Sequence, residues 1–300
     1  MCNLSENILF ELRKKEEEYC KIRRHFHKIP ELGLKEYKTT DGICEILESL
    51  GIHPIPLEPT GLVAYIGPEN APTIALRADI DALAVTEETG LPYASEHVGY
   101  MHACGHDGHL TGLIGAAEYL KKMEEDLTCR VKLIFQPSEE NTLGAKTVIA
   151  QGVMEDVDAI FGIHLFSDIP YGTISVEPGP RMAQTDRFTI TFEGKGGHAG
   201  KPHLCVDSTV LAAEFVLAAQ TIVSRQVNPV DAAVVTIGSL HSGTQYNIIS
   251  PKAVLEGTCR SFHIETARLL KESIERKASA IAMSYGAEFS IDYDFGSHPP

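Results

Sequence analysis

Short apolar runs alternate with amphipathic helical patterns in the N-terminal part of the chain, and this alternation constrains the fold more than any other feature. Three runs, at 73–77, 130–135 and 159–163, are short and mostly apolar, as is typical of buried strands. Helical patterns at 107–120 and 145–150 separate them. Strands that alternate with helices predict βαβ units and a mostly parallel sheet, so this part of the chain is expected to be an α/β domain.

Polar side chains follow all three predicted strands. Asp79 comes just after the first run, Glu139 and Glu140 follow the second, and His164 ends the third. Ligands of open α/β sheets bind in the crevice beyond the carboxyl ends of the strands, so these side chains are expected to face one crevice. Any one of them alone is as easily a solvated loop residue. Three such strand ends together favour a functional site.

The stretch 101–109 reads Met-His-Ala-Cys-Gly-His-Asp-Gly-His and leads directly into a helical pattern. Thiolate, imidazole and carboxylate are the side chains that bind zinc and its neighbours in the first transition row. Cys104 and His106 are spaced so that two ligands can converge from one tight loop. A single cysteine near histidines is also commonly a small buried hydrophobe, so the loop alone predicts only part of a site. With the strand-end residues, the sequence offers enough ligands for one or two metal ions.

A different pattern begins near Thr185. One half-exposed strand precedes a glycine-rich loop at 194–203, and further strands and two long helical patterns follow the loop, which gives the order βαββαβ. This order predicts a compact α+β module with its helices on one face of an antiparallel sheet, inserted after the first domain.

The charge and the cysteines exclude several classes of protein. A formal charge of −15 over 300 residues argues against partners such as nucleic acid or an anionic membrane, and it favours small-molecule partners. The start of the chain leads into the charged run 13–18 without the apolar core of a signal peptide, and no apolar run reaches membrane-spanning length. Seven scattered cysteines do not form a disulfide framework, and they lack the paired spacing of a structural zinc module. We therefore expect a cytoplasmic, globular protein.

Several motifs together resemble a known family. They are the segments 24–33 (RHFHKIPELG), 77–83 (RADIDAL) and 102–107 (HACGHD), the pair Glu139–Glu140, and 196–199 (GGHA) followed by Pro202 and His203. They are similar to the amidohydrolase branch of the aminoacylase and carboxypeptidase-G metallopeptidase superfamily. That branch includes hippurate hydrolases, indole-acetyl-amino-acid hydrolases and N-acetyl-diaminopimelate deacetylases. The resemblance covers nearly the whole chain and implies a two-metal catalytic domain with an inserted lid and dimerisation domain.

The resemblance also implies a reaction and its residues. It implies a metal-dependent amidohydrolase that acts on linear amides and cleaves N-acyl amino acids to a carboxylic acid and a free amino acid. Glu139 is expected to be the general base for the attacking water. Two divalent ions per subunit, Mn, Zn, Co or Ni, are expected to be held by four ligands: Cys104, His106, Glu140 and His164.

Further roles are implied for residues of both domains. His198 is expected to stabilise the oxyanion in the active site of the other subunit, which implies a homodimer formed through the lid domain. Asn247 and Arg260 match the positions that hold the α-carboxylate of the substrate. Asp79 and Asp81 are expected to orient neighbouring groups without binding the metal. Three more histidines are candidates for contacts to the ligands or the substrate: His102, His109 and His203.

The chain departs from the family pattern at its end. Family members return from the lid to the catalytic domain and supply further strands, a helix and a last histidine ligand, whereas this sequence stops at Pro300. The predicted domains are therefore 1–182 (incomplete catalytic), 183–295 (lid and dimerisation) and 296–300 (hinge). Uncovered sheet edges and apolar helix faces are expected in the first domain.

Alternatives to the predicted amidohydrolase remain open. The chain is either a fragment of an active hydrolase or a shortened protein that binds metal or ligand, or only dimerises, without turnover. Within the superfamily, a dipeptidase or carboxypeptidase is the alternative activity. The acyl group, the amino acid and the physiological metal are not determined by the sequence.

Overall fold

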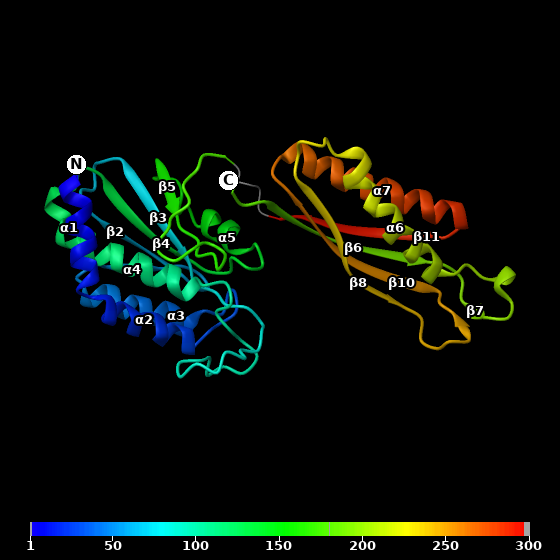
Figure 1. The fold of residues 1–300 in the computed structure, drawn as a ribbon, viewed down its shortest axis with the longest axis horizontal. Helices are drawn as coiled ribbons and strands as arrows, with labels where there is room; N and C mark the ends of the chain where they lie inside the picture. The colour runs from blue at the N-terminus through cyan, green and yellow to red at the C-terminus, as the bar shows by residue number, and fades with distance from the viewer. Residues whose placement is uncertain (1, 180, 297–300) are drawn as a thin grey trace. The chain divides into compact units, whose positions relative to one another are not determined.

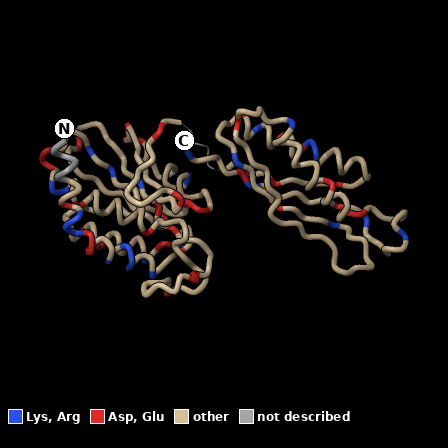
Figure 2. Tube along the Cα trace, viewed as in Figure 1, with Lys and Arg blue, Asp and Glu red and all other residues tan. Residues whose placement is uncertain are grey.

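The computed structural model describes residues 2–179 and 181–296 (Figure 1). The chain divides into two compact units, residues 1–174 and 175–300, named unit 1 and unit 2 below. The predicted hinge at 296–300 lies outside the described residues apart from Gly296. Within the described ranges, no helix combines the length and apolar character needed to cross a bilayer. Lys and Arg are interspersed among more numerous Asp and Glu along the trace (Figure 2).

Unit 1 is built on a five-stranded sheet in the order β1-β2-β4-β3-β5. The strands are listed here in chain order: β1 (Pro54–Pro56), β2 (Leu62–Ile66), β3 (Thr73–Asp79), β4 (Arg130–Gln136) and β5 (Ala159–Gly162). β3 runs parallel to both β4 and β5, whereas β2 is antiparallel to β1 and β4. The α/β class is therefore as predicted, but the sheet is mixed rather than mostly parallel.

The connections explain the direction of each strand. α4 (His106–Lys122) lies between β3 and β4, and α5 (Gly144–Ala150) lies between β4 and β5, so both connections are long enough for a parallel crossover. Only residues 57–61 join β1 to β2, and only 67–72 join β2 to β3. A parallel crossover needs a dozen or more connecting residues. The loop 57–61 therefore makes β1 and β2 antiparallel neighbours, and the loop 67–72 reverses the chain between β2 and β3, which lie on either side of β4.

Helices cover both faces of the unit 1 sheet. On one face, α2 (Glu16–Lys28), α3 (Tyr37–Ser49) and α4 pack on alternate residues of β2 and β4. This core includes Phe26, Leu47, Leu110, Leu133 and Phe135, all fully buried. On the other face, Val148 of α5 packs against Val63, Ala75 and Ile134. The alternation of side chains along each strand supplies both cores. Two further helical segments complete the unit: α1 (Cys2–Arg13) and η1 (Glu124–Asp126).

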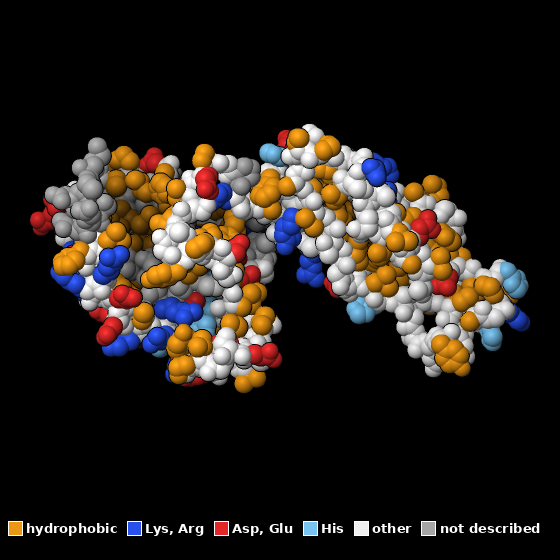
Figure 3. All heavy atoms as spheres, viewed as in Figure 1, with side chains coloured by type: hydrophobic (Ala, Val, Ile, Leu, Met, Phe, Trp, Pro, Cys, Tyr) orange, Lys and Arg blue, Asp and Glu red, His pale blue; other side chains and the backbone are white. Residues whose placement is uncertain are grey.

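β5 forms an exposed edge of this sheet. All four of its residues are exposed, and the Phe161 side chain is 62% exposed. Apolar side chains lie open on the face of unit 1 that carries α4 and β5 (Figure 3). This matches the expectation of an uncovered edge in the first domain.

Unit 2 is an antiparallel sheet with both of its helices on one face. The strand order is β11-β6-β10-β8, formed by β6 (Gln184–Glu193), β8 (Ala233–Ser242), β10 (Lys252–Ser261) and β11 (Glu288–Phe295). α6 (Ser208–Gln226) and α7 (Ile264–Tyr285) pack on it through a core that includes Phe188, Phe192 and Phe215. The chain order β6-α6-β8-β10-α7-β11 is the predicted βαββαβ arrangement. A small two-stranded sheet, β7 (Gly197–His198) with β9 (Ile248–Ile249), and the short helix η2 (Pro202–Leu204) complete the unit.

Candidate metal centre

The metal-binding candidates in the loop 101–109 are placed by a left-handed glycine at the start of α4. Gly105 has φ of +85° and is the N-cap of the helix, a conformation that glycine adopts without steric cost. His106 is the first helical residue and is fully buried, and Cys104 lies just before the turn. The potential ligand atoms of Cys104, His106 and His164 lie within 4.8 Å of one another.

The His106 ring has one nitrogen bound and one free. Its Nδ1 lies 2.9 Å from the carbonyl oxygen of Asp81 and 3.2 Å from Asp81 Oδ1, so this nitrogen carries the proton and donates it. Its Nε2 is buried and has no hydrogen-bond partner among the described residues. Asp79 Oδ2 and Glu140 Oε1 each lie 3.7 Å from that Nε2. A buried imidazole nitrogen that faces two carboxylates is an environment that a cation, either a proton or a metal ion, would complete.

The electrostatics of the site also favour a positive charge. Burial opposes protonation of His106, but its hydrogen bond to Asp81, the adjacent Cys104 thiol and the nearby Asp79 carboxylate raise its pKa to about 11. Burial and the neighbouring Asp79 and Glu140 carboxylates raise the pKa of Glu139. Burial also raises the pKa of Glu140, whose Oε1 has no partner within the described parts of the chain. His106, Glu139 and Glu140 thus each hold a proton more tightly than such groups ordinarily do, so positive charge is favoured at this centre.

The loop that carries Glu139 and Glu140 is fixed by a hydrogen bond to Glu36, a residue that belongs to none of the predicted site motifs. Ser138 has φ of +58°, and its amide donates to Glu36 Oε1 at 2.8 Å. Glu36 is fully buried, and its Oε2 accepts from the Thr60 hydroxyl at 2.6 Å. The Glu140 amide in turn donates to Asp81 Oδ2 at 3.0 Å. Glu36 was not identified from the sequence, because no local pattern distinguishes it from an ordinary surface glutamate before a helix.

His164 presents one ring nitrogen to the Cys104 thiol in the same site. Its Nδ1–H donates to the carbonyl oxygen of Leu165 at 2.7 Å, and its Nε2 lies 3.5 Å from Cys104 Sγ. The residue is half-buried at the end of β5. The thiol and this imidazole nitrogen therefore face each other across the loop.

Asp79 and His109 also lie close to His106, but their polar atoms are already satisfied. Asp79 Oδ1 accepts from His109 Nδ1–H at 2.6 Å, and Asp79 Oδ2 accepts from Arg77 Nη1 at 2.7 Å. Burial opposes ionisation of Asp79, but these two contacts keep the pKa of its carboxyl well below the usual range. The second nitrogen of His109 accepts from the Leu165 amide at 2.8 Å. Two further groups of possible ligand atoms share His106, namely Asp79, His106 and His109, and His106, Glu139 and Glu140. The donor atoms with the fewest other partners are on Cys104, His106, Glu140 and His164. This mixture of thiolate, imidazole and carboxylate fits a divalent transition metal.

A second buried polar cluster, formed by Asp107, His27 and Arg23, stabilises the loop 101–109. Asp107 Oδ2 lies 2.7 Å from His27 Nδ1 and 2.6 Å from Arg23 Nε. Next to it, His102 is almost fully buried, and burial lowers its pKa to about 4, so its ring is neutral at physiological pH. The sequence marked Asp107 as part of a motif but did not indicate His27 as its partner.

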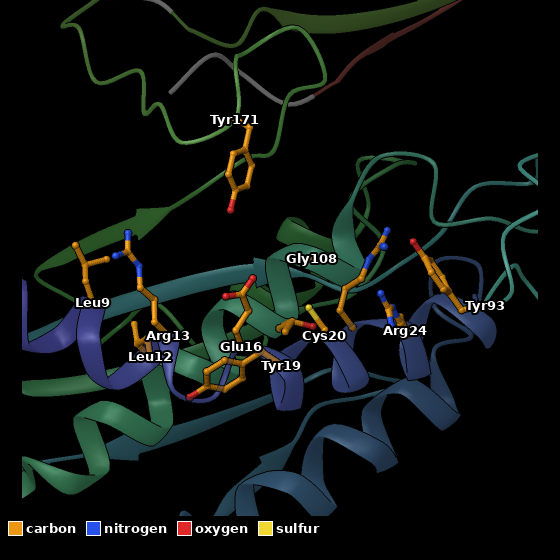
Figure 4. A pocket seen from close by; sticks show the side chains of 12 residues that line it. Leu9, Leu12, Arg13, Glu16, Tyr19, Cys20, Arg24, Tyr93, Gly108 and Tyr171 are labelled. Carbon is orange, nitrogen blue, oxygen red and sulfur yellow. The ribbon is translucent and has the colours of Figure 1, made fainter.

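Three cavities adjoin the start of α4, and the largest, of about 540 Å³, is lined by Ile8, Tyr19 and residues of α4. The second, of about 470 Å³, opens between α1, α2 and α4 and is lined by Leu12, Tyr19, Arg24 and Tyr93 among others (Figure 4). It contains none of the four candidate ligands. The third, of about 240 Å³, is lined by His109 and Leu165 together with residues of β3 and β5. The candidate ligands therefore lie at the strand ends and outside the cavity of Figure 4.

In unit 2 the structure brings together two of the three predicted site residues. His198 in β7 is exposed, and its Nδ1 accepts from the Gly200 amide at 2.9 Å. The Ala199 amide donates to the carbonyl oxygen of Asn247 at 3.2 Å, which places Asn247 beside it. Arg260 lies near the other end of β10, eight residues beyond Lys252, or about 26 Å at the rise of an extended strand. His203 is exposed in η2.

The chain is similar to known hydrolases. The model of the peptidase family M20/M25/M40 matches residues 75–285. The chain is 43% identical over 281 residues to an N-acetyl-L-cysteine deacetylase of Bacillus subtilis (strain 168), covering 93% of this chain and 67% of that protein. It is 39% identical over 276 residues to an N-acetyldiaminopimelate deacetylase of Shouchella clausii (strain KSM-K16), covering 91% and 73%.

A solved structure agrees with these sequence relatives. The crystal structure of Bacillus subtilis YXEP protein, described as a dinuclear metal binding peptidase from the M20 family, superimposes with a TM-score of 0.80 at 38% identity. The match covers 96% of this chain and 76% of that one.

Proposed function

The chain belongs to the peptidase family M20/M25/M40, and from this premise we propose that it is a metal-dependent amidohydrolase acting on N-acyl amino acids. The products would be a carboxylic acid and a free amino acid. The observation that carries the proposal is the buried, unpartnered Nε2 of His106, which faces Glu140 and lies beside Cys104 and His164. The deacetylases among its relatives support the substrate class.

Four side chains would hold the metal: Cys104, His106, Glu140 and His164. Two divalent ions, Mn, Zn, Co or Ni, are proposed because the similar Bacillus structure is described as dinuclear. Such ions, when bound, lower the pKa of water and polarise a carbonyl oxygen. Asp81 would orient two of the ligands, since it accepts from His106 Nδ1–H and from the Glu140 amide. Asp79 would act in the same way through His109 and Arg77.

Glu139 would carry the proton transfers. Its carboxylate accepts a proton from the attacking water while the water oxygen bonds to the acyl carbon, and it then delivers that proton to the leaving nitrogen as the C–N bond breaks. A general base that must later act as an acid works best with a pKa nearer to neutrality than that of an ordinary glutamate. Burial and the adjacent carboxylates raise the pKa of Glu139 in that direction.

Unit 2 would supply substrate contacts and the dimer interface. We assign His198 to oxyanion stabilisation in the site of a second copy, with Asn247 and Arg260 holding the α-carboxylate. His198 and Asn247 lie near one end of β10, and Arg260 lies near the other. Residues this far apart can contact the active sites of two different subunits more readily than a single site, which supports a dimer. β8 is an edge strand and α6 exposes Val210 and Leu217, which supports self-association through this unit.

The test is an assay with a matched pair of variants. The purified protein, loaded in turn with Mn, Zn, Co or Ni, is given acetyl-, benzoyl- and indoleacetyl-amino acids, with free dipeptides as competitors. Glu139→Gln should reduce the rate by about 100-fold or more while metal binding persists, because general acid–base catalysis contributes roughly 10²–10⁴-fold. Glu125→Gln, at an exposed glutamate, should match the parent. Metal binding without turnover in the parent would favour a binding protein, and preferred cleavage of dipeptides would favour a peptidase.

A further inference from the structure

We propose that His109 is a positioning residue that fixes the orientation of His164 by holding the backbone of Leu165. The inference rests on the proposed function in one respect only, namely that His164 is a metal ligand. His109 itself offers no free nitrogen to a metal, because both of its ring nitrogens are hydrogen-bonded.

The segment that carries His164 has little packing of its own. Ile163 is 79% exposed and Leu165 is 54% exposed, and both follow the exposed edge strand β5. The hydrogen bond from the Leu165 amide to His109 Nε2, at 2.8 Å, ties this segment to the buried face of α4. A ligand on an exposed segment needs such a tie, because a loosely held imidazole loses rotational freedom when it binds a metal.

The direction of each hydrogen bond leading to Leu165 is set by the one before it. Arg77 Nη1 donates to Asp79 Oδ2 at 2.7 Å, which stabilises Asp79 as a carboxylate. Asp79 Oδ1 can then only accept, so His109 carries its proton on Nδ1 and donates it at 2.6 Å. The Nε2 of a neutral His109 is therefore an acceptor, which is what the Leu165 amide requires.

The same residue, Leu165, then sets the tautomer of His164. Its carbonyl oxygen accepts from His164 Nδ1–H at 2.7 Å, so the free lone pair of His164 is on Nε2. That Nε2 lies 3.5 Å from Cys104 Sγ. The amide and the carbonyl of one residue thus connect a buried histidine on α4 to the nitrogen that would bind the metal.

Asparagine and glutamine substitutions separate this role from general packing. The glutamine carbonyl reaches the position of Nε2, so His109→Gln can keep the bond to the Leu165 amide and lose the bond to Asp79. The asparagine amide reaches the position of Nδ1, so His109→Asn can keep the bond to Asp79 and lose the bond to Leu165. His53→Gln, at an exposed histidine, is the control.

Two measurements are made on each folded variant. Long-range proton–nitrogen correlation spectra of the metal-free protein, at mildly alkaline pH, report the tautomer of His164. Cobalt(II) titrations, followed by the thiolate charge-transfer band of Cys104, report metal affinity. We expect the parent, His53→Gln and His109→Gln to keep the Nδ1–H tautomer of His164. His109→Asn should lose that preference and bind cobalt about 10–100-fold more weakly, which is the usual effect of removing an outer partner of a ligand.

The other outcomes overturn either the inference or the proposed function. If His109→Asn keeps the His164 tautomer and the cobalt affinity while His109→Gln loses both, His109 acts through its hydrogen bond to Asp79 and not through Leu165. If both variants behave alike, His109 has no specific effect on His164. If the parent itself binds no cobalt, the proposed function fails, but the tautomer spectra still decide whether His109 orients His164.

Discussion

Units 1 and 2 differ in where they bury charged groups. In unit 1, carboxylates and imidazoles of the candidate centre are almost fully buried: Glu36, Asp79, Asp81, His106, Asp107 and His109. Among the described residues of unit 2, Asp186 is the buried carboxylate, and His198 and Asn247 are exposed. Burying charge is costly unless it is paired, so the groups in unit 1 form a connected network. The side chains of the candidate centre in unit 1 are therefore fixed in position by contacts within the unit. The exposed His198 and Asn247 of unit 2 would instead be fixed by a substrate or a second copy of the chain.

Removing a free ligand atom in unit 1 should have the largest effect. His106→Asn takes away the buried Nε2 that faces Glu140 and Asp79, so we expect cobalt affinity and turnover to fall by more than about 100-fold, beyond the range for an outer partner. Cobalt titration and the acyl-amino-acid assay measure both. If the cobalt affinity of His106→Asn is unchanged, His106 is not a metal ligand. The proposed difference between a buried metal centre in unit 1 and exposed contact residues in unit 2 would then be wrong.

Removing the exposed imidazole of unit 2 should affect turnover alone. His198→Gln is expected to lower kcat by roughly 10²–10³-fold, as for loss of an oxyanion donor, with cobalt affinity unchanged. Mixing it with Glu139→Gln should restore part of the activity if His198 acts in the site of a second copy. A mixture that stays as inactive as its components would show that each copy works with its own His198.

The stability of unit 1 should depend on the buried charge of Glu118. Burial opposes ionisation of Glu118, but hydrogen bonds from Lys15, Lys122 and Tyr19 lower its pKa from 4.5 to about 2. A lowered folded-state pKa means that the stabilisation is complete above the unfolded pKa and is lost as pH falls through the folded one.

We therefore expect Glu118→Gln to cost unit 1 about 2 kcal/mol at neutral pH, as for a hydrogen bond to a charged group. The difference from the parent should shrink between pH 4.5 and about 2. Urea unfolding at several pH values measures it, and a cost that does not vary with pH would show that the carboxylate charge is not what stabilises the unit.

The smallest effect is expected from the buried carboxylate of unit 2. Tyr293→Phe removes the hydroxyl that donates to Asp186 Oδ2 at 2.8 Å, which should cost about 1 kcal/mol. Only the unfolding of unit 2 should change, and metal affinity should not. An effect on cobalt binding would contradict the separation between a structural charge in unit 2 and a functional network in unit 1.

Much of the architecture could be predicted from periodicity. The βαβ units around β3, β4 and β5, and the βαββαβ order of unit 2, follow from apolar spacing that is local in the sequence. The antiparallel direction of β2 was not predicted, although the short segments on either side of it, 57–61 and 67–72, leave no room for a parallel crossover. The place of β4 between β2 and β3 depends on tertiary packing. The roles of the individual site residues remain predictions, although Cys104, His106, Glu139, Glu140 and His164 do converge in groups.

By itself, the sequence determined which side chains are available and in which order they follow the strands. Only the tertiary structure decided which of their atoms are free. The partners that make this choice are distant in the chain: Glu36 holds Ser138 across 102 residues, His27 holds Asp107 across 80, and His109 holds Leu165 across 56. A hydrogen bond between such residues has no periodic signal, because it forms only when packing of the apolar core brings separate elements within about 3 Å.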